Sequence, residues 1–189
     1  MTEQELLIDC LERLNRIKAA YMVTGSMASN YWGIPRSTHD LDFVLHLPPS
    51  SIPLLVSAFA DSFFLQREAI ESAYQSPHQF NVIDQRSALK IDFWLLHGDS
   101  FEKSMFDRRL RIVVFGVEAW IATPEDVILH KLYWNRLNPS DRQLADASGI
   151  VAVQQDKLDK HYLRTWASPL NVSTVLEHLL AGRIAPKST

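Results

Sequence analysis

The sequence predicts an α+β fold, in which helices flank a mixed β-sheet and a C-terminal helical segment follows. Short apolar segments with strand-type composition recur up to about residue 122, and their number and order favour this class over a doubly wound parallel sheet. From Thr123 onward the apolar spacing and the capping residues are helical. We therefore expect an α/β core over residues 1–122 and a helical segment over residues 123–189 that packs on it.

The first half of this core is expected to alternate helices and strands. Thr2 and Glu5 form a capping box at the start of an amphipathic helix, and Gly33 and Pro35 end the second helix. The expected elements are a helix over 3–19, a buried strand over 19–25, a helix starting next to Ser26, a strand over 40–47 and a helix over 50–60.

Two hairpins complete the expected core. One lies in 78–96 with its turn near 84–87, and the other lies in 108–122 with its turn at Gly116. A short helix over 100–107 separates them. The helical segment begins with Thr123 as N-cap and proline at the first helical position. The helical segment is interrupted at 138–140, and Ser140 and Gln143 predict a second capping box at the start of the next helix. Two further helices are expected near 158–167 and 171–182.

Composition restricts the function only broadly. The chain has 189 residues, is 47% hydrophobic and carries a formal net charge of −3, which argues against broad charge-driven nucleic-acid binding. The single cysteine, Cys10, cannot form an internal disulfide, and acidic residues stand where a signal peptide has basic ones, so we expect a cytoplasmic protein. No apolar run approaches the roughly 20 residues that cross a bilayer, so no membrane partner is expected.

Three features of the core carry chemistry. Gly25 and Ser26 join a buried strand to a helix start, where backbone N–H groups can bind an anion and glycine lets a phosphate approach. Asp40 and Asp42 point to the same side of a strand, and their repulsion is tolerable when a cation such as Mg²⁺ or Mn²⁺ binds between them. Each feature alone is more often a plain capped turn or a pair of solvated acids.

The third feature is Asp92, a carboxylate inside an otherwise apolar strand. A buried charge needs a partner, which is either Lys90 on the same strand face or a metal ion. Arg36, four residues before Asp40, can offset the carboxylate charge or reach a phosphate. A phosphate-binding turn with three carboxylates on neighbouring strands is the set of groups needed to transfer a nucleotidyl group.

The run from Gly25-Ser26 to Asp40-Leu41-Asp42 resembles the nucleotidyltransferase superfamily with the DNA polymerase beta-like fold. The segment Arg36 to Asp42 looks like the Arg-x-Thr-x-Asp-hydrophobic-Asp form of its minimal bacterial branches, which include the AbiEii-type toxins and uncharacterised relatives. The resemblance extends to the Ala122–Asp126 and Ser140–Gln143 segments, although the toxin helix often has Lys-Asp where this chain has Arg142-Gln143. It implies a nucleotidyltransferase-like sheet with catalytic, metal-binding Asp40, Asp42 and Asp92.

The resemblance also implies roles and partners. Gly25, Ser26 and Arg36 would bind the nucleotide, Lys131 would bind a phosphate, and Asp146 would be a supporting polar residue. The expected activity moves NMP from an NTP, with Mg²⁺ or Mn²⁺, to a hydroxyl of RNA, protein or a small molecule. A toxin–antitoxin role would add an antitoxin partner, and a homodimer is the other assembly considered. The alternative is a nucleotide- or partner-binding module that keeps the fold without chemistry.

Overall fold

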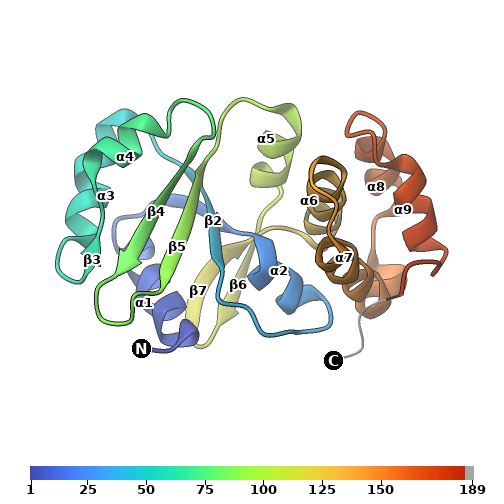
Figure 1. Cartoon of the computed structure of the whole chain (residues 1–189), viewed down its shortest axis with the longest axis horizontal. Helices are drawn as coiled ribbons and strands as arrows, with labels where there is room; N and C mark the ends of the chain where they lie inside the picture. Colours follow the sequence, from blue (N-terminus) through green and yellow to red (C-terminus); the bar gives the residue numbers. More distant parts are fainter. Residues whose placement is uncertain (186–189) are drawn as a thin grey trace. The chain divides into compact units, whose positions relative to one another are not determined.

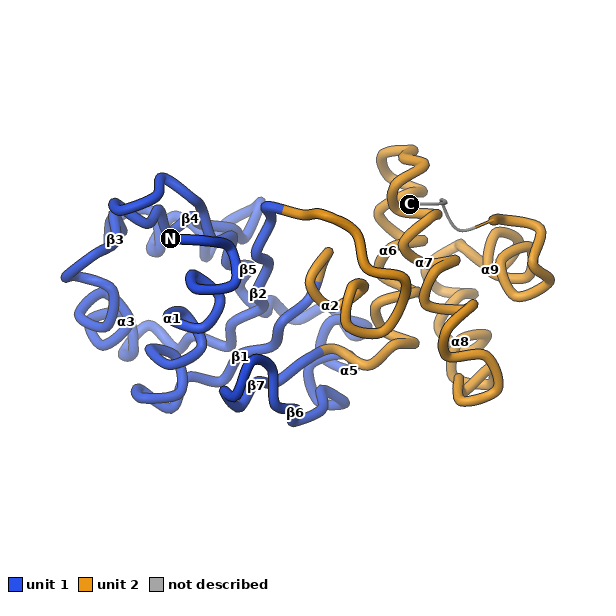
Figure 2. Tube along the Cα trace, turned by 90° about the horizontal axis from the view of Figure 1, so that it is seen from below, with its two compact units in different colours: residues 1–24, 39–121 blue, residues 25–38, 122–189 orange. Residues whose placement is uncertain are grey.

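A computed structural model describes residues 1–185, which form two compact units (Figure 2). The first unit contains Met1–Thr24 and His39–Ile121, and the second contains Gly25–Thr38 and the chain from Ala122 onward. The core over 1–122 and the helical segment over 123–189 remain predictions. The structure adds that the segment Gly25–Thr38 packs with the C-terminal helices rather than with the strands that flank it.

The first unit is built on one seven-stranded sheet with the order β3-β4-β5-β2-β1-β7-β6. Its parallel neighbours are β1 with β7 and β2 with β5, and its other neighbours are antiparallel, which confirms the mixed sheet of an α+β fold. The strands are β1 (Ala20–Val23), β2 (Leu41–His46), β3 (Phe63–Phe64), β4 (Gln79–Asp84), β5 (Lys90–Leu95), β6 (Leu110–Val114) and β7 (Val117–Ile121).

The helices of this unit are α1 (Glu3–Arg16), α3 (Ile52–Phe59), α4 (Arg67–Ser72) and α5 (Ser100–Asp107), with a short 3₁₀ helix over Pro49–Ser51. The capping box of Thr2 and Glu5 is confirmed at the start of α1. Figure 1 shows α3 and α4 at the β3–β4 end of the sheet. The ring of Phe59 on α3 packs against Phe93 of β5 at 6.1 Å. Phe93 also contacts Phe43 and stacks on Phe80, which fixes the apolar face of the sheet.

The second unit is helical. It contains α2 (Gly25–Trp32), α6 (Pro124–Leu137), α7 (Asp141–Gln154), α8 (Lys160–Ala167) and α9 (Ser173–Leu180), with a 3₁₀ helix over Gln155–Lys157. Thr123 caps α6 as predicted, because its hydroxyl accepts the N–H of Asp126. The second capping box is wrong: Ser140 is the N-cap of α7, but its side chain makes no capping hydrogen bond.

The segment between the predicted helix over 50–60 and the first hairpin holds two elements that the sequence did not indicate. β3 has two residues, too few to show a period of two. α4 has six residues and its N-cap, Gln66, makes no side-chain capping bond. Along residues 1–185, no helix combines the length and the apolar character needed to cross a membrane.

Two glycines let the backbone at the end of α2 come into direct contact with the backbone of α7. A Cβ added to Gly33, just after α2, would lie 2.8 Å from the backbone nitrogen of Ile150, and one added to Gly149 would lie 3.2 Å from the nitrogen of Ile34. The indole nitrogen of Trp32 donates to the carbonyl of Ala122 (2.8 Å) in the same unit. The end of α2 is therefore held against α7 without room for a side chain.

We expect Gly33→Ala to lower the free energy of unfolding by about 1–3 kcal/mol, because the new methyl group meets backbone atoms that cannot move aside. Urea denaturation measures the change. Ala152→Leu, which adds atoms at an exposed position of α7, is the control and is expected to change stability by less than about 0.5 kcal/mol. Equal stability of Gly33→Ala and the wild type would contradict the close approach.

Candidate functional site

Two aspartates of the first unit lie side by side on neighbouring strands. β2 and β5 are parallel, and their register pairs Asp42 with Asp92, so both side chains leave the same face of the sheet. Adjacent strands are about 4.8 Å apart, which places two carboxylates within strong mutual repulsion. Phe43 and Phe93, the next pair in the register, leave the opposite face and pack there at 5.4 Å.

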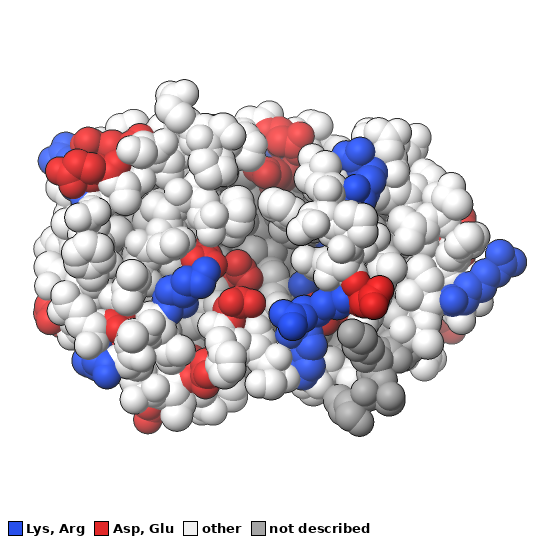
Figure 3. Space-filling model, in the orientation of Figure 1, with Lys and Arg blue, Asp and Glu red and all other residues white. Residues whose placement is uncertain are grey.

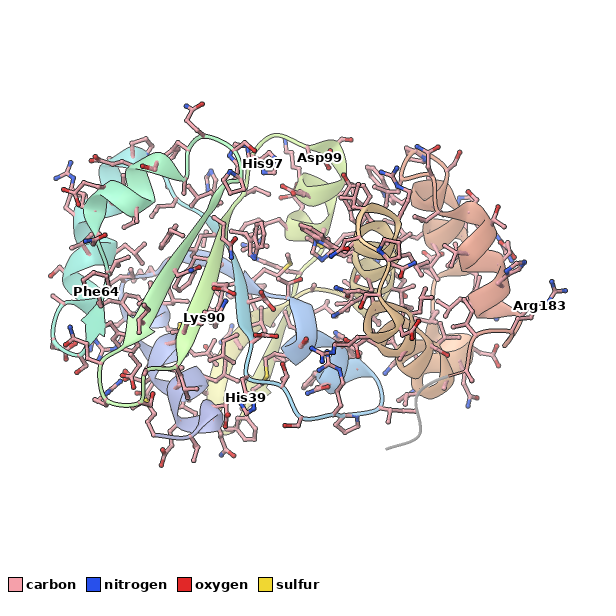
Figure 4. All side chains as sticks on the ribbon, in the orientation of Figure 1. His39, Phe64, Lys90, His97, Asp99 and Arg183 are labelled. Carbon is pink, nitrogen blue, oxygen red and sulfur yellow. The ribbon has the colours of Figure 1, made fainter. Side chains whose placement is uncertain are left out.

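Lys90, the first residue of β5, supplies a positive charge to this acidic face (Figure 4). Its Nζ donates to Oδ2 of Asp92 at 2.8 Å. The hydrogen bond to Asp92 raises the pKa of Lys90, and the charges of Asp92, Asp40 and Asp42 add to this effect against the opposing effect of burial. One ammonium group is therefore under the influence of all three carboxylates predicted as catalytic, and Figure 3 shows acidic side chains gathered beside a basic one over β2 and β5.

The carboxylate of Asp92 has one oxygen without a partner. Its side chain is 10% exposed, and Oδ1 is buried with no hydrogen bond. Such an oxygen is costly to bury unless something binds it. A hard divalent cation such as Mg²⁺ or Mn²⁺ prefers carboxylate oxygens, so the donor chemistry of these residues suits the metal that the sequence predicts.

The three carboxylates do not form a ready-made metal cluster. No group of three or more His, Cys, Asp or Glu side chains within residues 1–185 is arranged to hold a metal ion. At this position the ammonium of Lys90 binds one oxygen of Asp92. Both alternatives for Asp92 were open from the sequence, and the structure shows the lysine partner. Metal binding by Asp40, Asp42 and Asp92 remains a prediction.

The remaining predicted site residues all lie in the second unit. Gly25 begins α2 with φ of 60°, in the left-handed region that glycine adopts without strain. Ser26 is buried, and its hydroxyl accepts a hydrogen bond from Nη2 of Arg36 at 2.9 Å. The serine predicted at the helix start is thus bound to the arginine predicted to offset charge.

Asp146 on α7 binds both Arg36 and Lys131. Its Oδ1 accepts from Nε of Arg36 at 2.7 Å, and its Oδ2 accepts from Nη2 of Arg36 and from Nζ of Lys131, each at 2.9 Å. The side chains of Asp146 and Lys131 are 5% and 7% exposed. Lys131 is therefore a buried, paired lysine rather than a solvated one, and Arg36, Lys131, Asp146 and Ser26 form one hydrogen-bonded cluster, called here the basic cluster.

The charges of the basic cluster do not cancel. Two cations and one carboxylate leave a formal charge of +1. Burial acts to raise the pKa of Asp146, but the hydrogen bond from Arg36 and the charge of Lys131 outweigh burial and lower it. Asp146 therefore stays ionised and holds both cations in place, and the surplus positive charge suits an anionic group such as a phosphate.

His130, beside Lys131 on α6, is held neutral. The indole N–H of Trp134 donates to Nε2 of His130 at 2.8 Å, so this nitrogen keeps its lone pair. Burial, aided by the charge of Lys131, lowers the pKa of His130 to about 4.

Two polar residues near these groups were not singled out from the sequence. Asn81 of β4 pairs in register with Asp92, so its exposed amide shares the acidic face. Ser29 of α2 donates to the carbonyl of Ser26 at 3.0 Å and lies 3.4 Å from Oδ2 of Asp146. The spacing of three between Ser26 and Ser29 on one helix is the signal that would have indicated the second serine.

The architecture of the chain is nucleotidyltransferase-like. The chain is similar to the crystal structure of an antigenic nucleotidyltransferase-like protein from Paracoccidioides brasiliensis, with a TM-score of 0.56 and 15% identity over 98% of this chain and 94% of that one. It is also similar to the crystal structure of ANT(2″)-Ia in complex with adenylyl-2″-tobramycin, with a TM-score of 0.61 and 10% identity over 90% of this chain and 98% of that one.

A solution structure of ANT(2″)-Ia, described as an antibiotic-resistance factor, gives a TM-score of 0.58 and 12% identity over 92% of this chain and 94% of that chain. No protein-family model and no curated protein matches the sequence. The nucleotidyltransferase-like fold that the sequence resemblance implied is therefore confirmed, whereas its AbiEii-type branch remains a prediction.

We expect Asp146→Asn to lower the free energy of unfolding by about 3–5 kcal/mol, because Arg36 and Lys131 would lose the carboxylate that both of them bind. Chemical denaturation measures the loss. Asp141→Asn, at an exposed position in the first turn of the same helix, is the control and should cost less than about 1 kcal/mol. Similar losses in the two variants would contradict the organising role of Asp146.

We expect acid to destabilise the fold through His130. Its folded-state pKa of about 4 lies below the unfolded value of 6.5, so the unfolded state binds a proton first as the pH falls. The stability contributed by neutral His130 is present above pH 6.5 and is lost between pH 6.5 and 4, by about 3 kcal/mol. Between pH 6.5 and 4, the free energy of unfolding of His130→Gln should fall by less than that of the wild type. If both free energies fall equally with pH, His130 is excluded as the cause.

Proposed function

We propose that the chain is a metal-dependent nucleotidyltransferase that moves NMP from an NTP to a hydroxyl acceptor. The observation that carries the proposal is the acidic face of the sheet. Asp42 and Asp92 are in register on adjacent parallel strands. Asp40 and Asp42 act on the same ammonium as Asp92, and an oxygen of Asp92 is buried without a partner. A structural ion pair alone would not need three carboxylates.

In the proposed reaction the acceptor oxygen attacks the α-phosphorus of the NTP, the bond from that phosphorus to the bridging oxygen breaks, and pyrophosphate leaves. Asp40, Asp42 and Asp92 would hold Mg²⁺ or Mn²⁺, which when bound polarises the phosphate and offsets the charge of the leaving group. Asp92 is proposed to help deprotonate the acceptor hydroxyl, either directly through Oδ1, which has no hydrogen-bond donor, or through the metal.

The nucleotide-binding role of the second unit is also a proposal. Gly25 and Ser26 begin α2, whose first N–H groups can bind an anion. Arg36, Lys131 and Asp146 carry a formal surplus of one positive charge in a mostly buried cluster. We propose that Gly25, Ser26, Arg36 and Lys131 bind phosphate oxygens of the NTP, with Asp146 as the support that keeps the two cations in place.

The acceptor is RNA, protein or a small molecule in this proposal. The neighbour ANT(2″)-Ia was solved with adenylyl-2″-tobramycin, in which a nucleotidyl group is attached to a small molecule. This makes small-molecule hydroxyls the first acceptor class to test. A toxin–antitoxin role with an antitoxin partner, or a homodimer, belongs to the same proposal through the sequence resemblance alone.

The second candidate is a nucleotide- or partner-binding module without catalysis. It is favoured by the ion pair of Lys90 with Asp92, which occupies one oxygen that catalysis would use, and by the lack of a preformed metal cluster in residues 1–185.

We expect the protein to transfer label from α-labelled NTPs in the presence of Mg²⁺ or Mn²⁺ to a panel of aminoglycosides, total RNA or a protein mixture. Asp42→Asn keeps the size of the side chain and removes its charge, and it should reduce transfer at least about 100-fold. Asp107→Asn, which removes an exposed carboxylate at the end of α5, should transfer label as the wild type does.

Equal label transfer by Asp42→Asn and the wild type would overturn the proposed catalytic role. Isothermal titration with NTP and Mg²⁺ separates the two candidate functions. Binding in the micromolar to millimolar range without transfer to any acceptor of the panel would favour the non-catalytic module.

A further inference from the structure

Strand β6 ends the sheet on the side away from β3, and one of its edges has no neighbouring strand within residues 1–185. It has five residues, whereas β3 at the opposite end has two. Natural proteins protect such edges with very short strands, proline, charged residues or a bulge. β6 has the sequence LRIVV and an uninterrupted register with β7, and the guanidinium of its one charged residue, Arg111, is bound to Glu118 of β7. The edge is therefore long, regular and weakly protected.

The turn between β6 and β7 determines which backbone groups face this open edge. Phe115 and Gly116 have φ of 49° and 83°, the left-handed values of a two-residue type I′ turn. The residues that flank the turn, Val114 and Val117, are partners in the register. In a two-residue hairpin these flanking residues exchange two hydrogen bonds, and every second pair along the ladder does the same.

The groups that face the open edge belong to Arg111 and Val113. The alternation directs the N–H and C=O groups of Ile112 toward β7, and those of its two neighbours toward the open side. Both neighbours are exposed, and Val113 is 65% exposed. Two donors and two acceptors are thus presented to solvent at the spacing of an antiparallel ladder.

A second copy of the same strand matches this edge when a two-fold axis passes beside Ile112. In that antiparallel register Arg111 of each copy pairs with Val113 of the other, and four backbone hydrogen bonds use all of the outward groups. Ile112 then meets its own counterpart, and Leu110, which is 43% exposed, meets Val114. All of the cross-strand pairs on this face are apolar, as favours pairing.

The charges on the other face of β6 are compatible with this register. Arg111 is bound to Glu118 of its own chain, so two copies bring together two arginines and two glutamates with a formal sum of zero. Each arginine lies opposite a valine, whereas an axis moved to Arg111 would set the two arginines directly opposite each other, which is destabilising. Arg109 lies over the rings of Phe106 and Trp120 at 4.0 and 5.0 Å, so its own chain holds it.

We propose that β6 is a self-association edge, through which two copies of the chain join their sheets by antiparallel pairing centred on Ile112. The inference goes beyond the proposed function and does not depend on it. In the sheet order β7 and β1 separate β6 from β2, so the pairing uses none of the proposed catalytic residues. A strand of a different protein would need the same backbone groups, and the experiment distinguishes the two partners.

Sedimentation equilibrium of the full-length protein, up to millimolar concentration, tests the association. We expect a reversible dimer with a Kd in the micromolar range, because the interface is small. Val113→Lys places a cation opposite Arg111 of the second copy and opposite Glu118 of its own chain. It should therefore fold, as circular dichroism would show, but dimerise at least about tenfold more weakly than Val113→Glu. Val113→Glu is the matched control because it loses the same apolar contact.

Cysteine cross-linking tests the register. Ile112→Cys should form a disulfide between two copies under mild oxidation with diamide, because partners that share no backbone hydrogen bonds in antiparallel strands have Cα atoms about 4.5 Å apart. Leu110→Cys is the matched control. It lies on the same face of β6 but opposite Val114 of the second copy, so it should not cross-link. The natural Cys10 is buried and is unchanged in both variants.

A wild type that stays monomeric up to millimolar concentration would overturn the proposal and make a strand of a different protein the remaining candidate partner. Equal weakening by Val113→Lys and Val113→Glu would place the association on another surface and overturn it as well. The same conclusion follows if Leu110→Cys cross-links as readily as Ile112→Cys. If Val113→Lys does not fold, the two cysteine variants decide the outcome.

Discussion

The parallel pairing of β2 with β5 is the constraint on which the candidate site depends. Their register places Asp42 beside Asp92 on one face and Phe43 beside Phe93 on the other. A shift of one strand by one residue would bring a phenylalanine to the acidic face and a carboxylate into the aromatic core. The packing of Phe59 and Phe80 on Phe93 therefore also fixes the positions of the two aspartates. The apolar core thus holds two like charges side by side, and the ammonium of Lys90 donates a hydrogen bond to one of them.

The two units contain charged clusters of opposite composition. In the first, the charges of Asp40, Asp42 and Asp92 all act on the half-exposed ammonium of Lys90. In the second, one buried carboxylate binds two cations and leaves a positive surplus. The second arrangement is fully hydrogen-bonded at Asp146, which makes it rigid.

Much of the fold followed from local sequence signals, since capping residues, proline breaks and period-two alternation act within a few positions of the element that they define. Thr123 and the hairpin turn at Gly116 are examples. β3 and α4 were missed because they are too short to show a period, and Ser140 has the residue type of a capping box but makes no capping bond. For the site, alternation along one strand correctly linked Lys90 to Asp92. The partners of Arg36 could not be derived in this way, because Asp146 is 110 positions away and only the packing of α2 on α7 brings them together.

The chain passes between its two units three times, after Thr24, after Thr38 and after Ile121. Cutting the gene near codon 122 would therefore not release an autonomous first half. The truncated product would keep α2 but lose α6 and α7, and with them the backbone contact at Gly33 and the salt-bridge partners of Arg36. Insertions, split-protein fragments and circular permutants are better directed to the exposed turn at Gly116, where φ is 83° and a Cβ added to the glycine would meet no atom within 4 Å.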